Sequence, residues 1–280
     1  MEVFTSVKSL RNYLDQQLLQ QRTIGLVPTM GALHEGHISL IESAIRQTDI
    51  TVCSIFVNPT QFNNPEDLLK YPRTPEEDYA MLEKAGCSAV FAPTVEEMYP
   101  EKAVLKINFG TLETVMEGAS RPGHFNGVGI VVSKLFNIVR PHKAYFGQKD
   151  LQQVSIIKRL VADLSFDLEL VICPTVRERD GLAMSSRNRR LNEAERAIAP
   201  AIYKVLTSAK ENLLAGKQVH DVTELAKSEF LSMKEFTLDY IEIADLKTLQ
   251  SVERIGPEGS NAICIAVFLG PVRLIDNIVF

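Results

Sequence analysis

The sequence has no tryptophan, only four cysteines, and no apolar run near the ~18 residues that a membrane-spanning helix needs. The cysteines are Cys53, Cys87, Cys173 and Cys264, and they form no Cys-x-x-Cys pair and no spacing typical of metal ligands. Three of them lie inside apolar stretches, so we expect small, buried, unreactive side chains. These absences argue against a cysteine-based metal site and against a membrane partner.

An excess of positive charge is also absent. The chain carries 30 basic and 35 acidic side chains, and the formal net charge of −5 argues against a nucleic acid partner. Positive charge is concentrated in a single short segment, at Arg177, Arg179, Arg187, Arg189 and Arg190. The first residues contain no basic region ahead of an apolar one, so we expect no secretory signal and a cytoplasmic location.

The Gly-x-Gly-x-x-Gly motif of dinucleotide-binding folds is missing as well. The first part of the chain instead alternates apolar strands with helical patterns, which is typical of a parallel sheet covered on both faces. The expected strands are 23–27, 51–57, 88–92, 143–146 and 168–172, and the expected helices are 7–20, 37–47, 76–85, 126–138 and 150–162. We predict an α/β fold, a Rossmann-like doubly wound parallel sheet over residues 1–175, with ligands beyond the carboxyl ends of the strands.

The pattern changes near residue 176. Helical stretches at 192–214 and 220–234 precede an alternating strand at 238–243, and a hairpin turn at 269–271 joins strands at 262–268 and 272–277. Because 280 residues are many for one domain, we predict a smaller C-terminal α+β domain over 176–280 that closes over the site.

The most informative segment runs from Pro28 to His37 and reads Pro-Thr-Met-Gly-Ala-Leu-His-Glu-Gly-His. It follows an expected strand and precedes an amphipathic helical pattern. A helix N-terminus attracts phosphate, and imidazoles at i and i+3 share one helix face where they can add hydrogen bonds. Gly36 lets a phosphate approach the backbone. Two surface histidines at a helix start are the alternative, but the position after a strand favours a triphosphate site.

Two further segments contain polar side chains near expected strand ends. Asn58 and Gln61 follow the second strand and can donate to a carboxylate or accept from a hydroxyl, although an Asn-Pro turn explains them equally well. The segment 117–127 is too rich in glycine, proline and charge for a core, so we expect an ordered functional loop, with disorder as the alternative.

Lys149 and Asp150 also lie where an expected strand runs into a helix. Lys149 can place a positive charge beside phosphates, Asp150 can accept from ribose hydroxyls, and Gln153 lies one turn further on. A salt-bridged surface pair is the simpler alternative.

Ser185, Ser186 and Arg187 form the last motif, within a glycine-containing basic loop. Two hydroxyls and a guanidinium can bind phosphate oxygens, whereas a solvated basic loop is the alternative.

Together these motifs resemble a known family. His-x-Gly-His with a Met-Ser-Ser-Arg loop is similar to the nucleotidylyltransferase superfamily, whose class I aminoacyl-tRNA synthetases carry Lys-Met-Ser-Lys-Ser; those lysines are missing here. More narrowly, the chain resembles the pantothenate synthetase family almost from end to end. The motifs that carry this resemblance lie at 28–37, 56–62, 121–128, 146–153, 180–188 and 273–277.

The resemblance implies an ATP-dependent acid–amine ligase. (R)-pantoate and β-alanine would condense to pantothenate through a pantoyl adenylate, with release of AMP and pyrophosphate. Mg²⁺ would accompany ATP, and the protein would be a cytoplasmic homodimer. Glu77 and Asp78 could approach that ion, but their spacing does not establish it. Another His-x-Gly-His nucleotidylyltransferase, or a nucleotide sensor without turnover, remains an alternative.

The resemblance also implies roles for individual residues. The catalytic set would be His34, His37, Lys149, Ser185 and Arg187. The side chains that bind pantoate and β-alanine would be Asn58, Gln61 and Gln153. The ATP-binding set would be Met30, Gly31, Ala32, Leu33, His34, Glu35, Gly36, His37, Gly147, Gln148, Lys149, Asp150, Val176, Met184, Ser185, Ser186 and Arg187.

Overall fold

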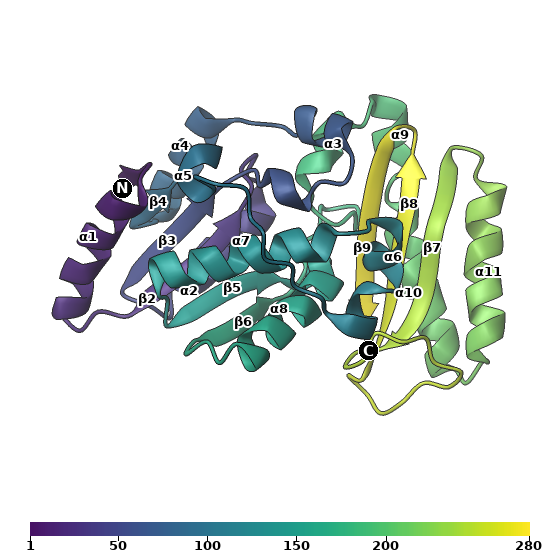
Figure 1. Ribbon diagram of the computed structural model, residues 1–280. Coiled ribbons are helices and arrows are strands. Elements are labelled where there is room, and N and C mark those ends of the chain that lie inside the picture. Colours follow the sequence, from purple (N-terminus) through teal and green to yellow (C-terminus); the bar gives the residue numbers. More distant parts are fainter. The chain divides into compact units, whose positions relative to one another are not determined.

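A six-stranded sheet forms the centre of the first of two units in the computed structural model, which describes residues 1–280 (Figure 1). Its strands pair in parallel in the order β1-β4-β3-β2-β5-β6. Their bounds are β1 Glu2–Phe4, β2 Ile24–Thr29, β3 Ile50–Ile55, β4 Ala89–Phe91, β5 Lys143–Gly147 and β6 Glu169–Cys173. The direction of winding reverses between β2 and β5, and open sheets of this type bind ligands at the carboxyl ends of the strands beside such a reversal.

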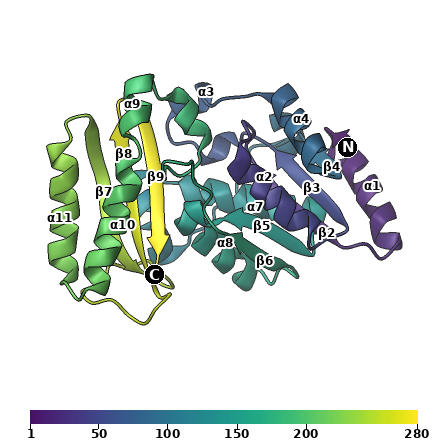
Figure 2. The same ribbon diagram turned by 180° about the vertical axis from the view of Figure 1, so that it is seen from behind.

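Helices cover both faces of this sheet. On one face α1 (Val7–Leu19) packs against α7 (His124–Val139), and α7 lies in front of the strands in Figure 1. On the other face α2 (Glu35–Ile45) packs against α4 (Pro75–Ala85), and α2 lies in front of the strands in Figure 2. The remaining helices that begin in this part of the chain are η1 Pro59–Gln61, α3 Pro65–Leu69, α5 Val95–Met98, η3 Gln148–Asp150 and α8 Leu151–Asp163.

The core of the first unit explains its strand sequences. Strands buried on both faces need apolar residues almost continuously. Accordingly Ile24, Leu26 and Val27 of β2 are fully buried, as are Val52 and Cys53 of β3. The central strands are therefore fixed by apolar burial on both sides.

The second unit contains a three-stranded antiparallel sheet in the order β7-β8-β9, with α10 packed against β8 and β9 and α11 against β7. Apolar side chains such as Leu206, Phe230 and Ile263 fill the space between the helices and the sheet. A second cluster, which includes Met116, Leu151 and Cys264, also belongs to this unit. The elements are η2 Gly110–Glu113, α6 Met116–Ser120, η4 Ser186–Arg190, α9 Glu193–Ile198, α10 Ala201–Leu214, α11 Val219–Ser232, β7 Phe236–Asp245, β8 Asn261–Leu269 and β9 Val272–Val279.

Two short segments from the first half of the sequence, Gly110–Ser120 and Lys149–Gln152, belong to the second unit, which resumes at Thr175. Gln152 joins them, because its amide nitrogen donates to the carbonyl oxygens of Leu112 and Val115 at 2.8 and 2.9 Å. The sequence-based domain limits of 1–175 and 176–280 assign both segments to the first domain. In the structure they belong to the second unit, and Lys149 and Asp150 belong to it with them.

The predicted fold class is confirmed by the parallel sheet and the smaller antiparallel one. The short helices α3, α5 and α6 were not predicted, and two further differences have a clear physical reason. The single helix expected at 192–214 is two helices, α9 and α10, because Pro200 lacks a backbone N–H and interrupts the hydrogen-bond ladder. The short edge strand β1 was not predicted, since three residues carry too little periodicity.

The segment 117–127, which was expected to be an ordered loop, is ordered but mostly helical. It contains the end of α6 and the start of α7, and Glu117, His124 and Phe125 are all buried. Charge is tolerated there because Glu117 is paired with Arg273 of β9 at 2.7 and 2.8 Å. No helix of the protein combines the length and the apolar character that crossing a bilayer would require.

Candidate active site

The turn between β2 and α2 is held by a buried carboxylate. Asp78 of α4, which is 1% exposed, accepts hydrogen bonds from the backbone N–H groups of Ala32 and Leu33 at 2.9 and 2.7 Å. The hydroxyl of Thr74 donates to the same carboxylate at 3.1 Å. Gly31 and Ala32 have φ values of +81° and +50°, a conformation that needs such support at a non-glycine residue. Asp78 therefore fixes the backbone that leads to the two histidines.

His34 and His37 lie at the N-terminus of α2, where the sequence predicted a helix start, and together they form a capping box. Nδ1 of His34 accepts from the backbone N–H of Gly36 at 3.2 Å, and Nδ1 of His37 accepts from the N–H of His34 at 3.3 Å. A nitrogen that accepts carries no proton, so the pattern assigns the proton of each neutral ring to Nε2. The rings lie 4.1 Å apart between centroids. Each imidazole is thus oriented as an Nε2–H donor at a helix N-terminus, where anions bind.

Asn58 and Gln61 lie beyond β3 and are both buried. Nδ2 of Asn58 donates to Oε1 of Gln61 at 3.1 Å and to the carbonyl oxygen of Gly127 at 3.2 Å. Nε2 of Gln61 lies 3.1 Å from Sδ of Met30. Because its oxygen is occupied by Asn58, Gln61 is oriented as a donor, and the structure brings Met30, Asn58 and Gln61 together.

Three residues outside the predicted set complete this network. The hydroxyl of Tyr99 donates to Oδ1 of Asn58 at 2.9 Å. Nδ1 of His124 donates to the carbonyl oxygen of Gln61 at 2.7 Å, which leaves Nε2 to accept from Arg121 at 3.2 Å. Arg121 and His124 belong to a motif that the sequence singled out without assigning a role, whereas no sequence signal pointed to Tyr99.

Lys149 and Asp150 occupy the 3₁₀ turn after β5, within the second unit. Nζ of Lys149 lies 3.7 Å from Oδ1 of Asp150, and the lysine side chain is 17% exposed. The carbonyl oxygen of Lys149 accepts from Nδ2 of Asn277 at 2.8 Å. The salt-bridged pair considered from the sequence is therefore present, at a distance that leaves the ammonium able to bind another anion.

The loop that precedes the Ser-Ser-Arg motif is a small hairpin. Arg177 and Ala183 form an antiparallel bridge, and the N–H of Met184 donates to the carbonyl oxygen of Val176 at 3.0 Å. The hydroxyl of Ser185 accepts from the N–H of Arg187 at 3.3 Å and caps η4. The three residues of the motif thus have a defined backbone, and Ser186 is buried.

Arg177 holds this hairpin against β9. Its guanidinium makes two hydrogen bonds to the carboxylate of Asp276, at 2.6 and 3.0 Å, and lies 3.8 Å from the ring centroid of Tyr203. Burial raises the pKa of Asp276, and the hydrogen bonds from Arg177 oppose that shift.

The predicted site residues are divided between the two units. Within the first unit the structure joins His34 to His37 and Met30 to Asn58 and Gln61, and within the second it joins Lys149 to Asp150 and Val176 to Met184. The first unit contains Met30, Gly31, Ala32, Leu33, His34, Glu35, Gly36, His37, Asn58, Gln61, Gly147, Gln148 and Gln153. The second contains Lys149, Asp150, Val176, Met184, Ser185, Ser186 and Arg187.

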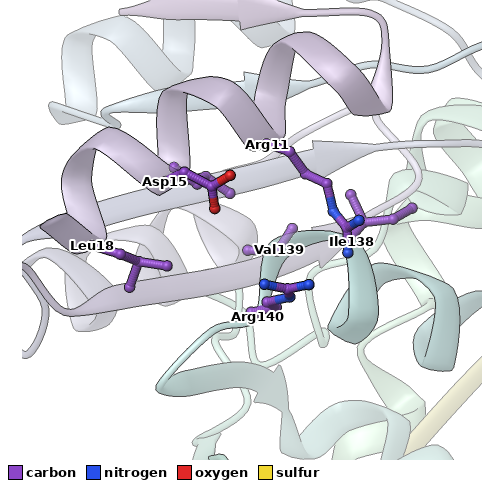
Figure 3. Close-up of a pocket in the computed structure, with 7 residues that line it drawn as sticks. Arg11, Asp15, Leu18, Ile138, Val139 and Arg140 are labelled. Atoms are coloured by element: carbon purple, nitrogen blue, oxygen red, sulfur yellow. The ribbon is translucent and has the colours of Figure 1, made fainter.

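A separate cavity lies in the first unit between α1 and α7 (Figure 3). It has a volume of about 50 Å³, room for a water molecule or two but not for a nucleotide. None of its lining residues, which include Arg11, Asp15 and Arg140, belongs to the predicted site.

The chain's own residues do not form a cage for a divalent ion. No group of three or more His, Cys, Asp or Glu side chains is arranged to hold a metal. Both oxygens of Asp78 already accept hydrogen bonds from the turn before α2.

A family model described as pantoate-beta-alanine ligase matches residues 2–279. The chain belongs to this family. A pantothenate synthetase from Porphyromonas gingivalis is 50% identical over 278 residues, covering 99% of both chains. One from Cytophaga hutchinsonii is 48% identical over 276 residues, covering 98% of both.

Solved structures agree with this family membership. The pantothenate synthetase of Thermus thermophilus superposes with a TM-score of 0.93 at 42% identity, covering 99% of both chains. The pantoate-beta-alanine ligase of Francisella tularensis, solved in complex with beta-gamma ATP and beta-alanine, has a TM-score of 0.84 at 37% identity and covers 100% of this chain and 97% of that one. The predicted family is confirmed, and the chain is an ATP-dependent ligase.

Proposed function

We propose that this chain condenses (R)-pantoate with β-alanine, using ATP and releasing pantothenate, AMP and pyrophosphate. In the first half-reaction a pantoate carboxylate oxygen attacks the α-phosphorus of ATP, the bond to the β-phosphate breaks, and pantoyl adenylate and pyrophosphate form. In the second, the amine of β-alanine attacks the acyl carbon, AMP leaves, and the amine loses a proton. No side chain needs to act as a covalent nucleophile.

The observation that carries this proposal is the paired histidine cap of α2. Both Nδ1 atoms accept from backbone N–H groups, so both rings present Nε2–H at a helix N-terminus. Preorganised donors of this kind stabilise the charge that develops on a phosphoryl group during transfer. We assign His34 and His37 to the triphosphate, to which each ring would donate a hydrogen bond from Nε2.

The remaining roles follow from charge and donor orientation. Lys149, Ser185, Ser186 and Arg187 are assigned to the leaving pyrophosphate, to which they offer cationic and hydroxyl groups. Gln61 acts as a donor toward pantoate, because Asn58 occupies its amide oxygen; Gln153 is assigned to the same substrate. Asp150 is assigned to the ribose, and Met30, Gly147, Val176 and Met184 to the rest of the nucleoside.

Mg²⁺ is proposed to enter as part of the nucleotide substrate, since no three His, Cys, Asp or Glu side chains are grouped to hold it. The proposed form of the enzyme is a cytoplasmic homodimer, as the family resemblance implies. Light scattering coupled to size-exclusion chromatography tests the dimer, and a monomer mass would overturn that part of the proposal.

One assay tests the reaction. Pyrophosphate and AMP are measured with ATP and Mg²⁺ while pantoate and β-alanine are omitted in turn. The proposal requires pyrophosphate to depend on pantoate, and stoichiometric AMP and pantothenate to depend on both substrates. Release of pyrophosphate with the nucleotide retained on the product would indicate another nucleotidylyltransferase. Nucleotide binding without turnover would indicate a sensor.

A further inference from the structure

Two adjacent side chains of β9 contact the turn that carries Lys149 and the hairpin that precedes Ser185. We propose that Asp276 and Asn277 are positioning residues that hold Lys149 and the Ser185–Arg187 motif in the arrangement needed for adenylation. This inference rests on the proposed function, because it concerns the residues through which that function would act.

Asn277 holds the turn that carries Lys149. Its Nδ2 donates to the carbonyl oxygen of Lys149 at 2.8 Å across 128 residues of sequence, and its side chain is buried, with only 3% of the residue exposed. Lys149 lies in a single 3₁₀ turn, which has few backbone hydrogen bonds of its own. The bond from Asn277 therefore fixes the backbone from which the ammonium group extends.

Asp276 holds the hairpin that precedes Ser185. Its carboxylate takes two hydrogen bonds from Arg177, whose guanidinium also donates to the carbonyl oxygen of Gly181 at 3.1 Å, across the turn of the hairpin. Such two-pronged pairs fix orientation as well as distance. The hydrogen bonds of Arg177 therefore stabilise the hairpin itself, whereas Arg187 belongs to the Ser185–Arg187 motif that follows the hairpin.

The two anchors are coupled to each other. The N–H of Asn277 donates to Oδ1 of Asp276 at 2.7 Å, and Nη2 of Arg177 donates to the carbonyl oxygen of Asn277 at 3.2 Å. Both residues lie in the β8–β9 ladder, opposite Ile265 and Cys264. The backbone of Lys149 and the base of the hairpin are thus held by consecutive residues of one paired strand.

Asn277→Asp tests the first anchor with little change in volume, because it removes the N–H donor and places an oxygen against the carbonyl of Lys149. We expect kcat for pyrophosphate release to fall roughly 10- to 100-fold, the range for small misplacements of a positioned group, while KM for pantoate changes less than about twofold. The second half-reaction, started from pantoyl adenylate and β-alanine, should keep its rate.

A double-mutant cycle separates positioning from general damage. If Asn277 acts through Lys149, Asn277→Asp combined with Lys149→Ala is about as slow as Lys149→Ala alone. Arg177→Lys tests the second anchor, because it keeps the positive charge but loses the two-pronged contact with Asp276. It should slow pyrophosphate release selectively in the same way.

Val272→Ala is the matched control. Val272 lies on the same strand, fully buried in the apolar core and without a polar partner among the site residues. It should lower the melting temperature and leave both half-reactions at their normal rates when these are measured below that temperature.

The possible outcomes distinguish a failure of the proposed function from a failure of the positioning role alone. A wild-type protein that releases no pyrophosphate from ATP and pantoate overturns the proposed function and this inference with it. An active wild-type protein overturns the positioning role alone in either of two cases: the Asn277 and Lys149 effects multiply, or Asn277→Asp slows both half-reactions equally.

Discussion

At the scale of single residues, the histidines of the α2 turn have a defined tautomer because each Nδ1 accepts from a backbone N–H. This arrangement combines two functions in one side chain, because the same ring caps the helix and presents a donor. The sequence predicted the helix start and the shared face of the two rings. It did not predict the capping box, since histidine is not among the preferred N-cap residues.

His37→Ala should lower the rate of adenylation by about 10²- to 10³-fold, the range for removal of one preorganised donor in a transition state. The measurement is the initial rate of pyrophosphate release with saturating ATP and pantoate. His142→Ala is the control, because its ring accepts from the N–H of Ile24 at the opposite end of β2. Near-normal release by the His37 variant would contradict the assigned role.

Gln61→Ala and Gln153→Ala should weaken the use of pantoate and leave ATP affinity nearly intact. A buried amide partner left unsatisfied costs about 1–3 kcal/mol, or roughly 5- to 150-fold in the affected constant. Gln61 should show the larger effect, because its removal also leaves Nδ2 of Asn58 without that acceptor. Separate titrations with ATP and with pantoate decide the matter, and a loss confined to ATP would assign both residues to the nucleotide.

At the scale of elements, the sequence predicts a feature well when neighbouring residues determine it, and poorly when residues distant in the sequence determine it. Residues 28–37 could be placed between a strand and a helix because their apolar neighbours are periodic. The hydrogen-bond partners of the polar residues could not be predicted from the sequence. Tyr99 is 41 positions from its partner Asn58, and Asn277 is 128 positions from its partner Lys149. Pairs that distant leave no periodic signal in a single sequence. Glu117 was misjudged for the same reason, because its partner Arg273 lies 156 positions away.

The elements that carry Lys149 and Arg187 should act in the first half-reaction only. Lys149→Ala and Arg187→Ala should each slow pyrophosphate release far more than the reaction of pantoyl adenylate with β-alanine, because pyrophosphate has left before the amine attacks. The two half-reactions are measured separately, the second with preformed adenylate. Equal impairment in both would remove these residues from the pyrophosphate site.

The junction of α6 with β9 and β7 depends on a buried ion pair. Arg273 contacts both Glu117 and Asp239, and the hydroxyl of Tyr240 donates to Glu117 at 3.0 Å. Burial, followed by the negative charge of Glu117, raises the pKa of Tyr240, so the hydroxyl remains a donor.

Glu117→Ala should therefore lower the free energy of unfolding by about 3 kcal/mol or more, because a buried cation loses its principal partner. Asp239→Ala should cost about 1 kcal/mol or less, since Asp239 is 24% exposed and Arg273 keeps Glu117. Urea denaturation measures the free energy of unfolding of both variants. Equal losses of this free energy would show that the Glu117–Arg273 pair does not stabilise the junction of α6 with β9 and β7.

At the scale of the whole molecule, the two units are built from different sheets, and the second draws segments from two places in the first half of the chain. Composition and periodicity predicted both sheets, because each has an apolar pattern of its own period. They could not assign Gly110–Ser120 and Lys149–Gln152 to the second unit, because the contacts of these segments, which include the hydrogen bonds of Gln152 and Asn277, are made with residues distant in the sequence. The position of Lys149 in the second unit is therefore a property of tertiary contacts.

The cysteines provide a probe of the integrity of both units. All four are buried and free; the sequence predicted burial for Cys53, Cys173 and Cys264, which lie in apolar stretches, and made no such prediction for Cys87. Cys53, Cys87 and Cys173 lie in the first unit and Cys264 in the second. Burial raises the pKa of Cys87 to about 11 and of Cys264 to about 12, and that of Cys53 rises well above its ordinary value. Because the thiolate is the reactive form, these thiols are protected by protonation as well as by burial.

Iodoacetamide at pH 8 should consequently label none of the four cysteines in the native protein and all four in concentrated urea. Mass spectrometry of intact protein and of peptides counts the labels on each cysteine. Glu117→Ala offers a graded comparison, because Glu117 adds to the electrostatic rise in the pKa of Cys264, and its loss should make Cys264 the first thiol to react. Rapid labelling of Cys53 or Cys264 in the native wild-type protein would contradict the burial on which both cores depend.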